Sequence, residues 1–164
     1  MKISQKIAFC LTLIACRLSC GQTSPADDAM FAKYQVPLTF HGPIAKPVLT
    51  DQSEHMFRTR IRDGAAKGPV FADHYAVAVW GCGTSCISFA LINSKTGVVY
   101  MAPFSVSGFA ILHQGIHYRR NSRALHVVGE LNEANPADRW YVWNGKKLDL
   151  VSEEPAKPDP EMQP

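Results

Sequence analysis

Cys82 and Cys86 are the residues whose type and spacing point most directly to chemistry. The three residues between them can form a tight turn, so the two thiols can meet across a hairpin tip as a disulfide, whose Cα atoms lie about 5.5 Å apart. The alternative is a thiol hydrolase in which His74 activates a thiolate and Asp73 orients His74. An extended strand between His74 and Cys82 would separate them by about 20 Å or more. We therefore predict a disulfide that fixes the shape of the turn.

A metal site is the second chemistry to weigh. Cys82 and Cys86, together with His113 or His117, are residue types that bind zinc. His113 and His117 have the spacing of a helical pair, but Gly115 between them and the surrounding β pattern disfavour a helix. We therefore predict no metal and no cofactor. A metal-dependent hydrolase stays open beside the thiol hydrolase.

Hydroxyl chemistry is the third, in the segment from Pro103 to Phe109. This segment lacks the G-x-S-x-G pattern that exposes an activated serine, so we assign no catalytic residue to it. Small polar residues beside aromatic ones suit a binding loop, because they offer adaptable hydrogen bonds and apolar anchors. We predict a partner-binding loop formed by Phe104, Ser105, Ser107, Gly108 and Phe109.

The elements that must position these residues are mostly β-strands. Asn93 to Gly97 is typical of a turn, and Asn144-Gly145 is a strong hairpin signal. Trp140 and Trp143 fall on opposite faces of a regular strand, so we expect one in the core and the other on the surface. Two antiparallel meanders predict a mainly β fold, either a small sandwich or a partial propeller. The predicted strands are residues 75–80, 87–92, 98–100, 125–131, 140–143 and 147–151.

One short helix is predicted over residues 50–64, near the start of the β-rich domain. Asp51 and Glu54 have the spacing of a capping box, and Gly64 suits the C-terminal end. Prolines make residues 22–49 an extended, irregular lead-in, and a single domain spans residues 50–152. Residues 153–164 combine proline with charge and are predicted to be a disordered tail.

The N-terminus has the pattern of a secretory signal over residues 1–21. Lys2 and Lys6 precede a short apolar run, which is too short to span a bilayer. Two cleavage sites remain open: one before Cys16, which would be lipidated, and one before Gln22. We expect a periplasmic or secreted protein, or one anchored to the outer membrane through Cys16, in a compartment where Cys82 and Cys86 oxidise.

Charge argues against a nucleic-acid partner. Lys2, Lys6 and Arg17 account for the whole excess of 17 Lys and Arg over 14 Asp and Glu, so the chain after the signal is near neutral. Nucleic-acid binding needs a clustered positive surface. The one small cluster is Arg119, Arg120 and Arg123, which is either a solvated loop or a patch for an acidic partner.

The segment Trp80-Gly81-Cys82-Gly83-Thr84-Ser85-Cys86 resembles one found in small secreted bacterial proteins of uncharacterised function. The resemblance covers roughly residues 58–151 and implies no activity. This chain has Asp73 where the commoner pattern has glycine.

The expected architecture is also similar to that of periplasmic immunity proteins that block peptidoglycan amidases of the type VI secretion system. That resemblance implies an inhibitor that inserts a serine-bearing loop, here residues 105–108, into the cleft of another envelope protein. Together, these features predict an exported binding protein, an envelope inhibitor or immunity factor, rather than an enzyme.

Overall fold

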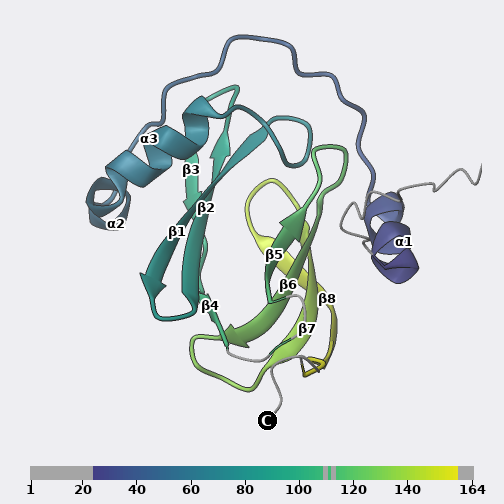
Figure 1. Cartoon of the computed structure of the whole chain (residues 1–164). Helices are drawn as coiled ribbons and strands as arrows, with labels where there is room; N and C mark the ends of the chain where they lie inside the picture. Colours follow the sequence, from purple (N-terminus) through teal and green to yellow (C-terminus); the bar gives the residue numbers. More distant parts are fainter. Residues whose placement is uncertain (1–23, 109–110, 112–113, 159–164) are drawn as a thin grey trace, which may run out of the picture.

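The computed structural model describes residues 24–108, 111 and 114–158, and in them the chain is mainly β, as predicted. Eight strands form one antiparallel sheet in the order β1-β2-β4-β6-β7-β8, with β3 added to β2 and β5 added to β6 (Figure 1). The helices are α1 (Pro25–Lys33), α2 (Gln52–Met56) and α3 (Arg58–Ala66). The strands are β1 (Tyr75–Gly83), β2 (Cys86–Asn93), β3 (Val99–Met101), β4 (Val106–Ser107), β5 (Gly115–Tyr118), β6 (Ala124–Leu131), β7 (Ala137–Trp143) and β8 (Leu148–Pro155).

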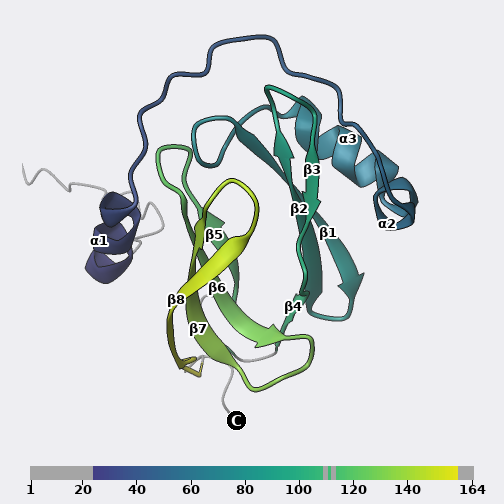
Figure 2. The same ribbon diagram turned by 180° about the vertical axis from the view of Figure 1, so that it is seen from behind.

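The two predicted meanders are present, and they face each other. β1, β2 and β3 form one and β6, β7 and β8 the other, and the short β4 joins them into a continuous sheet (Figures 1 and 2). Alternate residues point to the shared interior, where Val77 and Phe89 of the first meander pack in one cluster with Leu125 and Trp143 of the second. The main core therefore lies between the two halves of one bent sheet.

The predicted helix over residues 50–64 is instead two helices, α2 and α3. The Asp51–Glu54 capping box begins α2, as predicted. Gly64 lies inside α3, where it faces Ala78 of β1 so closely that an added Cβ would stand 2.4 Å from the Ala78 Cβ. The glycine that ends α3 is instead Gly68, which follows the C-cap residue Lys67 and has a φ of 82°.

The lead-in is not irregular throughout, because residues 25–33 form α1. Ser24 and Asp27 make a reciprocal capping box at its start. Phe31 packs edge-on against Trp140, with 5.0 Å between ring centroids, and so covers the outer face of β7. This packing buries Trp140, and Trp143 is buried separately in the main core, so the expectation of one surface tryptophan is wrong.

Residues 34–50, here called the connecting segment, run from α1 to α2 over one end of the sheet (Figure 1). Backbone hydrogen bonds tie it down at intervals, including Val36 N to Asn121 O and Val48 N to Gly97 O, both 2.9 Å. The first residues of the predicted tail, 153–155, belong to β8 and pair with β7, so the ordered domain extends beyond residue 152. No helix in the described part of the chain is long and apolar enough to cross a membrane.

Candidate functional site

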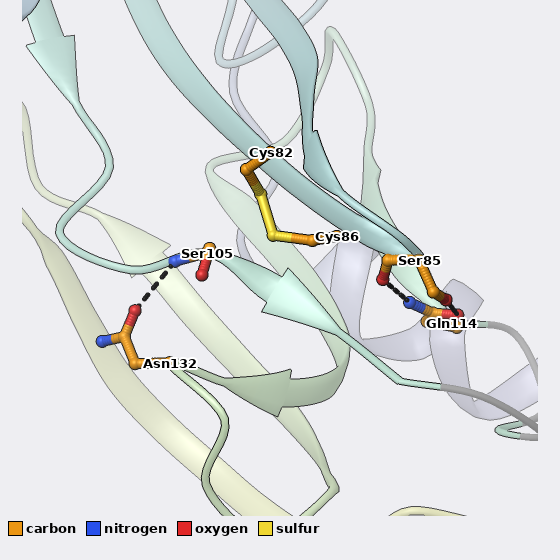
Figure 3. The surroundings of a disulfide bond; sticks show 6 residues. All are labelled: Cys82, Ser85, Cys86, Ser105, Gln114 and Asn132. Carbon is orange, nitrogen blue, oxygen red and sulfur yellow. Dashed lines mark hydrogen bonds between the residues drawn. A yellow bond between two sulfur atoms is a disulfide. The ribbon is translucent and has the colours of Figure 1, made fainter.

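The predicted disulfide is present at the tip of the β1–β2 hairpin. Cys82 and Cys86 are bonded, with their Cα atoms 5.1 Å apart (Figure 3). The register of the hairpin shifts between Gly81 and Gly83, and Ser85 in the turn has a φ of 54°. The bond therefore closes a short, irregular tip that strand pairing alone would hold weakly.

The serine segment lies beside this tip because β4 bridges the two meanders. Val106 pairs with Ile87 of β2 on one side and with Leu131 of β6 on the other. A further contact ties the tip to the segment, because the Ser85 hydroxyl donates to the Gly108 carbonyl. Gln114 also holds the tip, since its Nε2 donates to the Ser85 carbonyl at 3.0 Å (Figure 3). Two regions singled out separately in the sequence thus become one surface.

The turn after β6 forms the third wall. Asn132 forms two hydrogen bonds with Ser105. Asn132 Oδ1 accepts from Ser105 N at 3.1 Å (Figure 3), and Asn132 N donates to Ser105 O at 3.2 Å. Asn132 and Glu133 have φ values of 51° and 64°, an uncommon conformation for residues other than glycine. Glu133 lines the same concavity as Ser105 and Ser107.

A polar hollow of about 450 Å³ lies among these three elements, and we call it the disulfide hollow. Its walls offer hydroxyl groups, backbone groups and two carboxylates, which suit hydrogen bonding to the backbone and to basic side chains of another protein. It is lined by Cys82, Gly83, Thr84, Ser85, Cys86, Ser105, Ser107, Gly108, Glu130 and Glu133.

The structure distributes the predicted loop residues between the hollow and the core. Ser105, Ser107 and Gly108 line the hollow. Phe104 is half-buried and packs inward, stacked on Tyr141 at 5.3 Å between ring centroids. Phe109 lies outside the described residues. Ser105 and Ser107 are therefore available to a partner, whereas Phe104 packs inward.

The residues of the thiol-hydrolase alternative are not brought together. His74 directly precedes β1, whereas Cys82 is near its far end, and both thiols are joined in the disulfide. Asp73 Oδ2 does lie 3.3 Å from His74 Nδ1, as that alternative expected. Burial is the main cause that lowers the pKa of His74, followed by the nearby charge of Lys95.

The described residues contain no group of three or more His, Cys, Asp or Glu side chains placed to hold a metal ion. The His117 ring lies 5.5 Å from the ring of His126, its register partner on β6, and both thiols are joined in the disulfide. His113 and the proposed lipidation site Cys16 are outside the described residues.

Sequence reasoning missed Glu130, Asn132 and Glu133 as parts of the site. Glu130 lies near the end of the predicted strand 125–131, and Asn132 and Glu133 follow it. The pairing of β4 with β6 that brings this region to Ser107 is not encoded in local sequence. The Asn-Glu pair at the end of a strand was the one local sign of a turn.

A comparison of the chain with protein-family models, with curated proteins and with solved structures finds no match. The function must therefore be inferred from the residues of the hollow and their geometry.

Proposed function

We propose that this protein is an exported binding protein, an envelope inhibitor or immunity factor that acts by protein–protein contact through the disulfide hollow. The observation that carries the proposal is the convergence of the Cys82–Cys86 tip, the Ser105–Ser107 segment and the 130–133 turn on one polar concavity. The partner is another protein of the cell envelope, and the protein is periplasmic or secreted, with Cys16 as a site for a lipid anchor.

Rigidity supports binding as the role of this surface. The disulfide, the Ser85 and Gln114 contacts and the two hydrogen bonds between Asn132 and Ser105 fix all three walls before a partner arrives. A surface that is already ordered loses little conformational entropy on association, which favours affinity. The loop-insertion mode of the amidase immunity proteins has a serine-bearing segment enter the partner's cleft, whereas here Ser105 and Ser107 line a concavity, so in this proposal the partner supplies the element that enters.

The disulfide also supports export, because such bonds persist in oxidising compartments and are rare in the cytosol. The bond spans a sequence separation of only 4, so it removes little entropy from the unfolded chain. Its main contribution is to the shape of the hollow.

Co-expression with an exported peptidoglycan amidase toxin tests the proposal. The full chain should protect cells from lysis, and the S105W/S107W variant, which fills the hollow, should abolish protection. The matched control Q52W/T59W places the same two indoles on the exposed surfaces of α2 and α3 and should protect fully.

A second variant, Glu133→Lys, reverses a charge at the exposed rim without entering the core and should weaken protection. Circular dichroism and the oxidised mass establish that each variant is folded. Unchanged protection by folded S105W/S107W and Glu133→Lys would overturn the role of the hollow.

A further inference from the structure

A second concavity lies between α3 and the last part of the connecting segment (Figure 1). It has a volume of about 570 Å³, within the range of about 300–1,000 Å³ that small-molecule sites in proteins span. We call it the α3 groove, and it shares no lining residue with the disulfide hollow. Its lining includes Ile44, Lys46, Pro47, Arg62, Ala65 and Ala66.

The walls of the α3 groove are mostly apolar. On the helix side, Arg62, Ala65 and Ala66 share one flank of α3, because residues three and four apart in a helix are neighbours on its surface. On the other side, the Ile44 side chain reaches the end of the helix, since a Cβ built on Gly68 would lie 3.5 Å from Ile44 Cδ1. Ile44 is nevertheless 44% exposed, so apolar surface at the groove remains open to a ligand.

The fold holds both walls of the groove in place. Ala45 N donates to Ser94 O and Val48 N donates to Gly97 O, each at 2.9 Å, which fastens the connecting segment to the turn between β2 and β3. The close approach of Gly64 to β1 fixes α3 on the sheet. Walls that are already ordered lose little conformational entropy when a ligand binds.

Both charged residues in the described lining of the groove are cationic. Lys46 and Arg62 are exposed, and no hydrogen bond or ion pair joins either side chain to another described residue. No acidic residue of the described chain lines the groove. The groove therefore combines apolar walls with two positive charges that the fold leaves unmatched.

This combination suits an anion that carries an apolar chain. Arginine and lysine both bind phosphate, arginine through its fork of N–H groups and lysine as a point charge. A phosphate monoester carries a charge of about −1.5 to −2 near neutral pH, which matches two cations better than the single charge of a carboxylate. An alkyl chain lying against Ile44, Pro47 and Ala66 would remove their apolar surface from water.

We propose that the α3 groove binds a lipid phosphate, a molecule in which an alkyl chain ends in a phosphate group. Lys46 and Arg62 pair with the phosphate, and the chain lies along Ile44 and Pro47. This site does not depend on the disulfide hollow. Its failure would leave the proposed function intact, and a failure of the hollow to protect cells would leave this site intact.

Backbone amide signals in proton–nitrogen NMR spectra of the full chain test this proposal, because they locate binding residue by residue. The probe is dodecyl phosphate, kept below the concentration at which it forms micelles. The signals of residues 44–46 and 62–66 should shift saturably. Inorganic phosphate, dodecanoate and dodecyl maltoside should each bind at least about tenfold more weakly, because they lack the chain, the second charge and any charge, respectively.

The double variant K46Q/R62Q removes both cations and should weaken the binding of dodecyl phosphate at least about tenfold. The matched control R60Q/K67Q removes the same two residue types from exposed positions that do not line the groove, and should leave binding unchanged. Circular dichroism establishes that both variants are folded.

Three results would overturn the lipid-phosphate site. The first is that dodecyl phosphate does not bind, or shifts signals only outside the groove. The second is that any of the three comparison compounds binds as tightly as dodecyl phosphate. The third is that folded K46Q/R62Q binds the probe as well as the original protein does.

Discussion

Asp73 shows how one side chain can anchor a whole segment. It adopts a φ of 69° in the turn before β1, and its carboxylate accepts from the backbone N–H groups of Thr39 and Phe40. These contacts fasten the connecting segment to the sheet. The thiol-hydrolase alternative has Asp73 orient a catalytic His74, and the two side chains do touch, but most of the Asp73 contacts are to the connecting segment.

Asp73→Asn should destabilise the protein by roughly 1–3 kcal/mol at neutral pH, because buried charge-assisted hydrogen bonds are weakened while asparagine still tolerates the positive φ. Burial raises the pKa of the Asp73 carboxyl, but the hydrogen bonds from Phe40 and Thr39 outweigh burial and hold the pKa far below its usual range. The stabilisation is therefore complete above the unfolded-state pKa of about 3.9, and is lost as the pH falls toward the lower folded-state pKa.

Urea unfolding at pH 7 and at about pH 3 measures this effect, since the second pH lies below the unfolded-state pKa. The difference between the original protein and Asp73→Asn should shrink at the lower pH. Asp63→Asn, at an exposed position on α3, is the matched control and should change stability by less than about 0.5 kcal/mol. An equal difference at both pH values would contradict the anchoring role of the ionised carboxylate.

At the scale of elements, strands were easier to predict than helices. The runs that became β1, β2, β6 and β7 combine β-branched and aromatic residues with clear turn signals, so their local pattern agrees with their final environment. The helix α1 was missed because residues 25–33 show little apolar periodicity, and its stability depends on the packing of Phe31 against Trp140. The Ser24–Asp27 capping box was the available sign.

The interface between α3 and β1 depends on Gly64. An added Cβ would lie 2.4 Å from the Ala78 Cβ and 2.6 Å from its Cα, so Gly64→Ala must push the helix away from the sheet. We expect a loss of about 1–3 kcal/mol in the free energy of unfolding, typical of overpacking. Gly81→Ala is the control: it lies in β1, and its nearest neighbour, Cys86 O, would be 3.9 Å away.

Chemical denaturation of both glycine variants provides the measurement. A Gly64→Ala protein as stable as Gly81→Ala would show that α3 is free to shift, and that its close packing contributes little to the fold.

At the scale of the whole molecule, the bend of the sheet assembles the candidate site. The disulfide and the serine segment were predicted from local sequence, because cysteine spacing and small polar residues are local features. The third wall of the disulfide hollow, the turn after β6, was not predicted, because Ser107 meets Glu130 only through the β4–β6 pairing that links the two meanders.

The central claim is that the chain is an exported, disulfide-stapled binding scaffold rather than a thiol enzyme. The most direct test is the intact mass, native and denatured, of the protein recovered from a bacterial envelope fraction after expression with its own N-terminus. We predict a chain that begins at Gln22 or at an acylated Cys16, lacks the two hydrogens of the Cys82–Cys86 pair, and carries no metal. A chain that retains Met1 with both thiols free, or one that holds a metal in the native spectrum, would contradict the account.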